Sequence, residues 1–256
     1  IVNEENSLIG SLTDGDLRRG FINNLSFDHS ILEFIQRKPV FITHKNYNLN
    51  DLEVYKSKNY KIIPILNADG IIIDVLNFRI QKTIIPLDAV IMAVGRGTRL
   101  LPLTAKMPKP LIKVGDKPII EHNVDRLLEH GINNIYLSIN YLGDQIEEYF
   151  GDGHTKDAKF TYLRENKPLG TIGSISLVDR FEQEDILVMN SDLLTNIDFT
   201  DFYTAFKTAN ADMAVAATSY SVDIPYAVIE VDEGNVALSL KEKPRYTYYS
   251  NAGIYL

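Results

Sequence analysis

The chain has 256 residues, 45% of them hydrophobic, so it can bury the core of one large or two modest globular domains. Its net charge of -8, without any long lysine or arginine run, argues against a general nucleic-acid surface. The sequence has no cysteine, no apolar run near the roughly 20 residues of a membrane span, and no signal peptide, so we expect a cytoplasmic protein without nucleic-acid or membrane partners. It opens without methionine and stops at NAGIYL inside a predicted strand, so we expect a chain that is incomplete at both ends.

Residues 1–81 are predicted to form a small α+β module. Two apolar strands, 62–66 and 71–76, flank the turn 67–70, whose Asp-Gly pair is typical of a tight hairpin. A helix is expected near 31–37.

Residues 87–256 are predicted to form a second, α/β domain in which strands and helices alternate. The strands are 87–94, 134–140, 159–164 and 185–189, and the helices are 118–130, 143–150 and 171–181. This order predicts a Rossmann-like, mostly parallel sheet with helices on both faces. The remaining residues, 212–256, are predicted to be mostly strands.

The loop AVGRGTRLLPLTAKMPKP, residues 93–110, follows the first strand of this domain. Its cations are Arg96, Arg99, Lys106 and Lys109. Backbone N–H groups at the carboxyl end of a strand can converge on phosphate oxygens, so the loop predicts a polyphosphate ligand. Leu100 excludes the dinucleotide fingerprint, and the absence of Gly-Lys-Ser/Thr excludes a P-loop. A basic surface loop is the alternative interpretation.

Beyond this loop, the motifs YLGDQIEEYFGDG (141–153), PLGTIGS (168–174), MNSDLL (189–194), KEKP (241–244) and YSNAGIYL (249–256) follow in order. Together with residues 93–122, they resemble the sugar-1-phosphate nucleotidyltransferases. The resemblance covers about two thirds of the chain. It implies a domain that joins a nucleoside triphosphate (NTP) to a sugar 1-phosphate, releases pyrophosphate and uses Mg2+.

The resemblance also implies roles for individual residues. Expected to bind the nucleotide are Ala93, Gly95, Gly97, Thr98, Arg99, Gly170 and Thr171. The expected catalytic residues are Arg99, Lys109 at the reacting phosphate, Asp192 as the Mg2+ ligand and Lys243 at the sugar phosphate. Expected to contact the sugar are Glu165, Asn251 and Gly253. The second metal-binding aspartate of the family is expected beyond residue 256.

Several of these residues have a plainer interpretation. An aspartate after a strand, as Asp192 is, more often serves as a turn or cap residue. Lys243 before a proline reads equally as a solvated lysine, and Glu165 as an ordinary charge at the end of a strand. Two positions depart from the family pattern: Val94 stands where glycine or alanine is usual, and Ala227 replaces a glycine.

The segment LIGSLTDGDLRRGFI, residues 8–22, resembles the end of a CBS (cystathionine-β-synthase-type) motif, in which a strand leads into a helix. By this resemblance Gly10, Thr13 and Asp16 would bind an adenine nucleotide. Residues 62–79 resemble a second such motif that lacks the matching threonine and aspartate. A packing or dimerisation module is the alternative, and we expect a homo-oligomer.

The family members with such a front module favour GTP as the nucleotide and mannose, glucosamine or a related hexose as the sugar. Thymidylyl, uridylyl and cytidylyl transfer stay open. The alternative function is a nucleotide-sensing binding protein with a degenerate transferase domain.

Overall fold

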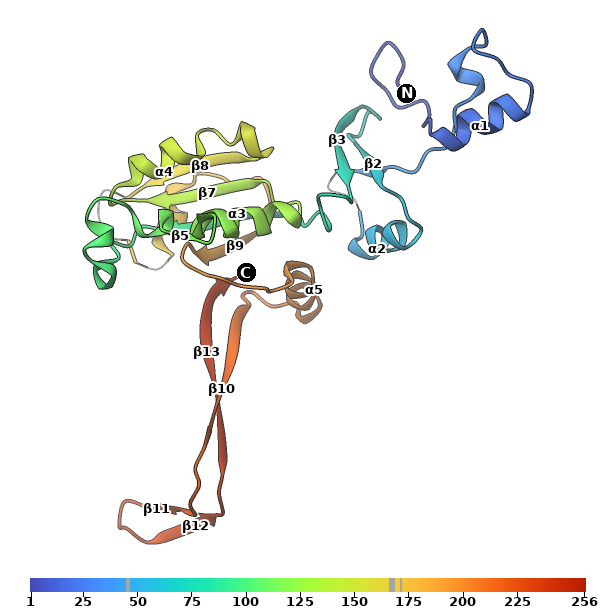
Figure 1. Cartoon of the computed structure of the whole chain (residues 1–256). Coiled ribbons are helices and arrows are strands. Elements are labelled where there is room, and N and C mark those ends of the chain that lie inside the picture. Colours follow the sequence, from blue (N-terminus) through green and yellow to red (C-terminus); the bar gives the residue numbers. More distant parts are fainter. Residues whose placement is uncertain (45–46, 166–168, 171) are drawn as a thin grey trace. The chain divides into compact units, whose positions relative to one another are not determined.

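The computed structural model describes residues 1–44, 47–165, 169–170 and 172–256. Its contacts divide the chain into two compact units (Figure 1). Unit 1 comprises Ile1–Pro86 with Leu128–Ile132, and unit 2 comprises Leu87–Leu127 with Asn133–Leu256. Within these described ranges, no helix has both the length and the apolar character that crossing a membrane requires.

Unit 1 is a small α+β module around a three-stranded sheet. Its elements are α1 (Asp14–Ile22), the 3-10 helix η1 (Ile31–Glu33), β1 (Ile42–Thr43), α2 (Leu49–Ser57), β2 (Ile62–Leu66) and β3 (Ile72–Asn77). The strand order is β1-β2-β3, with β1 parallel and β3 antiparallel to β2. The predicted hairpin is confirmed: the Asn67 side chain accepts hydrogen bonds from the backbone of Asp69 and Ile71, and Gly70 has a φ of 78°.

Two expectations for unit 1 are corrected. The helix expected at 31–37 is only the short η1, because the backbones of Gln36 and Ser11 bond to each other and hold this segment extended. The strand expected to lead into α1 is reduced to isolated bridges, such as the one between Val2 and Leu8.

Thr13 and Asp16 form a capping box at the start of α1. The Asp16 carboxylate accepts from the backbone N–H of Thr13 at 2.8 Å and also pairs with Arg19. The hydrogen bond from the Thr13 hydroxyl holds the pKa of Asp16 below its usual range. Gly10 packs closely against Ile35. These contacts give Gly10, Thr13 and Asp16 structural roles at and before the start of α1. The adenine-nucleotide site stays a prediction.

Unit 2 is built on a six-stranded sheet with the order β10-β13-β9-β4-β7-β8. Its elements are β4 (Leu87–Ala93), η2 (Thr98–Leu100), η3 (Leu103–Ala105), η4 (Lys109–Leu111), β5 (Lys113–Val114), β6 (Lys117–Pro118), α3 (Ile119–Glu129), β7 (Asn134–Ile139), α4 (Gly143–Phe150), η5 (His154–Lys156), β8 (Lys159–Arg164), η6 (Gly173–Leu177), β9 (Asp185–Asn190), α5 (Phe199–Ala209), β10 (Val215–Asp223), β11 (Val228–Val231), β12 (Ala237–Lys241) and β13 (Arg245–Tyr255). Strands β9, β4, β7 and β8 run parallel, while β13 and β10 join antiparallel. The predicted α/β fold with a mostly parallel sheet is therefore confirmed.

The central strand β4 is buried along its whole length, because both faces of the sheet are covered. One face is covered by α4, whose Phe150 ring lies 5.1 Å from that of Phe160 on β8. On the other face, Ile175 and Phe181 pack against a cluster that includes Val90.

The helix expected at 171–181 is corrected, because within the described residues 172–181 the structure has only the short η6. Serine side chains that bond to nearby backbone compete with helix formation, and the Ser176 hydroxyl donates to the Gly173 carbonyl at 2.7 Å.

Helix α5 was not among the expected elements. The Asp198 carboxylate begins it by accepting from the backbone of Thr200 and Asp201. Its buried residues Phe199, Tyr203 and Phe206 are spaced as on one face of a helix.

The last strands form a two-stranded ribbon, β10 with β13, that carries β11 and β12 at its far end (Figure 1). Only the end of β13 joins the central sheet, where Ile254 and Tyr255 pair with β9. The prediction of strands over 212–256 is confirmed.

Candidate active site

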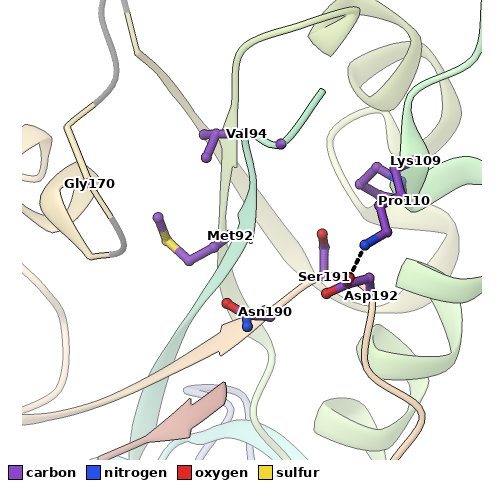
Figure 2. A pocket seen from close by; sticks show the side chains of 9 residues that line it. Met92, Val94, Lys109, Pro110, Gly170, Asn190, Ser191 and Asp192 are labelled. Carbon is purple, nitrogen blue, oxygen red and sulfur yellow. Dashed lines mark hydrogen bonds and ion pairs between the residues drawn. The ribbon is translucent and has the colours of Figure 1, made fainter. Parts of the chain in front are cut away.

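A pocket of about 220 Å³ lies at the carboxyl ends of β4 and β9 (Figure 2). The two strands are parallel neighbours, so the loops that follow them meet at the same edge of the sheet, the edge where α/β proteins bind ligands. The residues around the pocket are Met92, Val94, Gly95, Lys109, Pro110, Gly170, Asn190, Ser191 and Asp192.

The loop after β4 folds back so that its two ends meet. Gly97 has a φ of 63°, and a Cβ there would lie 2.9 Å from the Cβ of Lys109. The Thr104 hydroxyl donates to the Gly97 carbonyl at 2.9 Å and fixes this close approach. Lys109 is thereby placed beside Gly95 at the pocket, although it is distant in sequence.

Three further residues expected to bind nucleotide belong to the same loop but do not line the pocket. Ala93 is the buried end of β4, and Thr98 and Arg99 lie on η2 with exposed side chains. The Arg96 guanidinium lies 5.8 Å from the centre of the Tyr141 ring. Of the two loop cations expected to be catalytic, Lys109 lines the pocket and Arg99 does not.

Lys109 and Asp192, which both line the pocket, form an ion pair (Figure 2). The two side chains are 35% and 34% exposed, so a ligand can reach both. Each charge neutralises the other here, and a phosphate could compete for the ammonium while a cation could compete for the carboxylate. This pair joins two predicted catalytic residues that lie 83 residues apart in the chain.

Gly253 lies against Asn190, which lines the pocket. Its φ is 73°, and a Cβ there would lie 2.5 Å from the Asn190 side-chain nitrogen. The Asn251 side chain shapes this bend of β13, because its Oδ1 accepts from the Gly253 N–H at 2.8 Å and its Nδ2 donates to the Tyr255 hydroxyl at 2.8 Å. Of the predicted sugar residues on β13, Gly253 is thus next to the pocket-lining Asn190, and Asn251 is bonded to Gly253.

Glu165 is buried at the end of β8 and bonds to protein groups. Its carboxylate accepts from the Ser138 hydroxyl at 3.2 Å and from the Leu169 N–H at 3.1 Å. The second bond holds the backbone of Leu169, the residue before the pocket-lining Gly170. Thr171, expected beside the base, lies outside the described residues.

Lys243 is not brought to the pocket, contrary to expectation. It is exposed and lies just before Arg245, where the β10–β13 ladder ends. At about 3.4 Å per residue, the strand from Arg245 to Asn251 places the end of the ribbon about 20 Å from the pocket side. Ala227 lies in the same distal part of the ribbon and is exposed.

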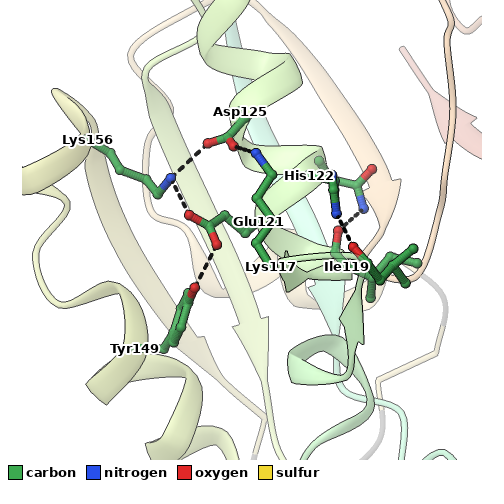
Figure 3. A network of polar contacts seen from close by, with 9 residues as sticks. Lys117, Ile119, Glu121, His122, Asp125, Tyr149 and Lys156 are labelled. Atoms are coloured by element: carbon green, nitrogen blue, oxygen red, sulfur yellow. Dashed lines mark hydrogen bonds and ion pairs between the residues drawn. The ribbon is translucent and has the colours of Figure 1, made fainter.

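A network of charged side chains holds the start of α3 (Figure 3). Lys156 lies 2.6 Å from Glu121 and 2.8 Å from Asp125, and Lys117 also pairs with Asp125. Burial opposes ionisation of both acids, but hydrogen bonds from the lysines outweigh it and lower the pKa of each carboxyl. The hydrogen bond to Glu121 raises the pKa of Tyr149 to about 12. The network therefore anchors α3 to the β5–β6 hairpin and η5.

We expect Glu121→Gln to lower the free energy of unfolding by about 1–3 kcal/mol at pH 7, because Lys156 loses a half-buried partner. The pKa of Glu121 is lowered on folding, so its contribution is present above the unfolded value of about 4.3 and is lost as the pH falls through the folded value. Urea unfolding at pH 7 and at about pH 3 should show the difference between wild type and variant shrinking on acidification. Glu147→Gln, which removes an exposed ion pair with Arg164, is the control and should change little. A difference independent of pH would contradict this account.

The donor set fits a magnesium ion that is shared with a phosphate ligand. Mg2+ prefers oxygen ligands and is commonly held by one or two carboxylates together with substrate phosphates. Asp192 supplies one accessible carboxylate. Among the residues that the structure describes, no group of three or more acidic, histidine or cysteine side chains forms a complete cage.

Sequence reasoning missed four residues that line the pocket: Met92, Pro110, Asn190 and Ser191. Pro110, Asn190 and Ser191 belong to motifs already described, and Met92 is near the end of the strand that precedes the glycine loop, so their closeness in sequence to Lys109, Asp192 and Gly95 was the available signal. It also missed Asn123, a polar residue on the apolar face of α3, which donates to the Ser191 carbonyl.

Residues 88–256 match the family model described as nucleotidyl transferase. The bifunctional protein GlmU of Methanococcus maripaludis is 34% identical over 173 residues, which cover 66% of this chain and 39% of that protein. The probable mannose-1-phosphate guanylyltransferase 1 of Oryza sativa is 33% identical over 176 residues, with 66% and 49% covered. The chain thus spans less than half the length of these relatives.

Two solved structures are also similar. HddC from Yersinia pseudotuberculosis, complexed with GMP-PN, has 27% identity and a TM-score of 0.50, with 66% of this chain and 75% of that chain covered. A putative glucose-1-phosphate thymidylyltransferase from Bacillus anthracis has 27% identity and a TM-score of 0.50, with 66% and 70% covered.

Proposed function

The chain belongs to the nucleotidyl transferase family, and from that premise we propose that the full protein transfers a nucleotidyl group from an NTP to a sugar 1-phosphate, with Mg2+ as cofactor. The observation that carries the proposal is the ion pair of Lys109 and Asp192 in a pocket that also receives the glycine loop after β4. In this pocket the Lys109 ammonium, which could bind phosphate, is paired with the Asp192 carboxylate, which could bind a metal ion.

In this reaction a phosphate oxygen of the sugar 1-phosphate forms a bond to the α-phosphorus of the NTP. The bond from that phosphorus to the oxygen bridging to the β-phosphorus breaks, and pyrophosphate leaves with its electron pair. Both partners are anions, so catalysis depends on positioning and on neutralising charge. No side-chain nucleophile is needed.

The residues of the pocket divide this work. The backbone at Gly95 leaves room for phosphate, because nothing lies within 4 Å of where its Cβ would be. Lys109 would leave Asp192 and hold a phosphate oxygen at the reacting centre. Asp192 would hold the Mg2+, which when bound neutralises the phosphates. Asn251 and Gly253 would contact the sugar beside Asn190, and Arg99 on η2 would reach the triphosphate from outside the pocket.

We favour GTP as the nucleotide and mannose, glucosamine or a related hexose as the sugar. One similar protein is named a mannose-1-phosphate guanylyltransferase, and one similar structure contains GMP-PN.

The test is pyrophosphate release by the full protein with Mg2+, each NTP in turn and a panel of sugar 1-phosphates. We expect release to be greatest with GTP and a hexose 1-phosphate, and to stop when EDTA removes the metal. If NTPs bind by calorimetry but no pair of substrates releases pyrophosphate, the chain is the nucleotide-sensing protein considered as the alternative.

A further inference from the structure

Helix α3 carries an amide in the middle of its buried face. Asn123 is 1% exposed and lies among Ile120, Val124 and Leu127, which are fully buried. An amide buried without partners costs free energy, so its hydrogen bonds indicate why a polar side chain stands at this position.

The Asn123 amide nitrogen donates to two carbonyls. One is the carbonyl of Ile119, one turn earlier on the same helix, at 3.3 Å. The other is the carbonyl of Ser191, 68 residues later in the chain, at 3.1 Å. The first bond is local to the helix, but the second ties α3 to the loop that carries Asp192.

Ser191 is therefore held through the peptide before it and through the peptide that links it to Asp192. The Ser191 N–H donates to the carbonyl of Met92 at the end of β4, at 3.1 Å, while Asn123 holds the Ser191 carbonyl. A peptide is planar, so fixing the Ser191 oxygen also fixes the plane that leads to the Cα of Asp192. The direction in which the Asp192 side chain leaves the backbone follows from that plane.

We propose that Asn123 is a positioning residue for Asp192: its amide orients the Ser191–Asp192 peptide so that the carboxylate faces the metal and the triphosphate. The proposal rests on the proposed function, because it takes Asp192 as the metal ligand. Asn123 itself touches neither ligand. The charged network around Glu121 and Asp125 holds α3 in place, so the amide acts from a fixed support.

The test compares two buried asparagines in the full protein. Asn134 is 7% exposed, and its amide donates to Asp88 at 2.8 Å, near the opposite end of β4 from the pocket. Asn123→Ala and Asn134→Ala each remove one buried amide, so both should lower Tm. Mn2+ affinity is measured by electron paramagnetic resonance with the NTP that gives most pyrophosphate release and without sugar phosphate, and kcat and KM are measured separately.

We expect Asn123→Ala to weaken Mn2+ binding and to lower kcat by about tenfold to a hundredfold each, with a smaller change in the KM for sugar phosphate. Asn134→Ala should keep Mn2+ affinity and kcat within about twofold. If Asn123→Ala loses Tm as Asn134→Ala does but keeps wild-type Mn2+ affinity and kcat, Asn123 only fills the core and the proposal is overturned.

Two further variants keep the result decisive. Asn123→Ser can bond to its own helix carbonyl but is too short to reach Ser191, so it replaces Asn123→Ala with the same expectations if the alanine variant does not fold. Asp192→Asn separates the two levels of the argument. If it keeps Mn2+ affinity, the metal assignment of the proposed function fails and the positioning role fails with it. If it loses Mn2+ while a folded Asn123 variant does not, only the positioning role is overturned.

Discussion

Replacing Asp192 by asparagine is expected to lower turnover by about a thousandfold, equivalent to about 4 kcal/mol of transition-state stabilisation. The neutral amide cannot hold Mg2+ as a carboxylate does, and it leaves Lys109 without its charged partner. The fold should persist, because an ion pair whose side chains are a third exposed contributes little to stability. Pyrophosphate release measures turnover, and circular dichroism melting checks the fold.

Asp185 offers a matched control at the start of the same strand. Its carboxylate accepts from the Tyr203 hydroxyl at 3.0 Å and pairs with Lys207 at 2.8 Å. It lies at the amino end of β9, whereas the pocket lies at the carboxyl end. Asp185→Asn should keep turnover within about twofold. A folded Asp192→Asn protein with wild-type turnover would remove Asp192 from the metal site.

Gly97→Ala is expected to lower kcat/KM by about a hundredfold, because it displaces Lys109 from the position in which it would hold the reacting phosphate. At the φ of 63°, a side chain costs about 1–2 kcal/mol, and the new methyl would lie 2.9 Å from both the Lys109 Cβ and the Thr104 methyl. The loop must open to accept it, and Lys109 moves with the loop. Steady-state kinetics of pyrophosphate release measure the effect.

Gly95→Ala is the comparison within the same loop. Its methyl would meet nothing within 4 Å, so Tm should be unchanged. If the triphosphate approaches this backbone, the KM for NTP should rise while the fold is kept. Equal kcat/KM for wild type and Gly97→Ala would show that the position of Lys109 does not depend on the close approach at Gly97.

Strands and helices with strong local signals could be predicted from the sequence. The helix at 143–150 and the strand at 159–164 have the predicted bounds, and β4 differs from its prediction by one residue. Each has an apolar pattern that ends at a glycine or a charged turn, so residues close in the sequence are enough to predict where the element begins and ends.

Predictions failed where a distant segment decided the backbone. Residues 31–37 have a helical pattern, but Gln36 bonds to Ser11 and is held extended. In the described part of the expected helix 171–181, only the short η6 forms, and Ile175 on η6 and Phe181 after it pack against the sheet. Local propensity is a weak preference that such contacts override.

The sequence by itself determined which residues stand at the ends of strands. Gly95 follows β4 and Asp192 follows β9, and because parallel strands present their carboxyl ends at one edge, a site containing both was predictable. Only the tertiary structure decided the partners across that site. Lys109 meets Asp192 across 83 residues, and Asn123 meets Ser191 across 68, while Lys243 stays on the distant ribbon. Periodicity and turn residues act over a few neighbours in the chain, whereas these contacts depend on how the sheet, α3 and the loops close together in three dimensions.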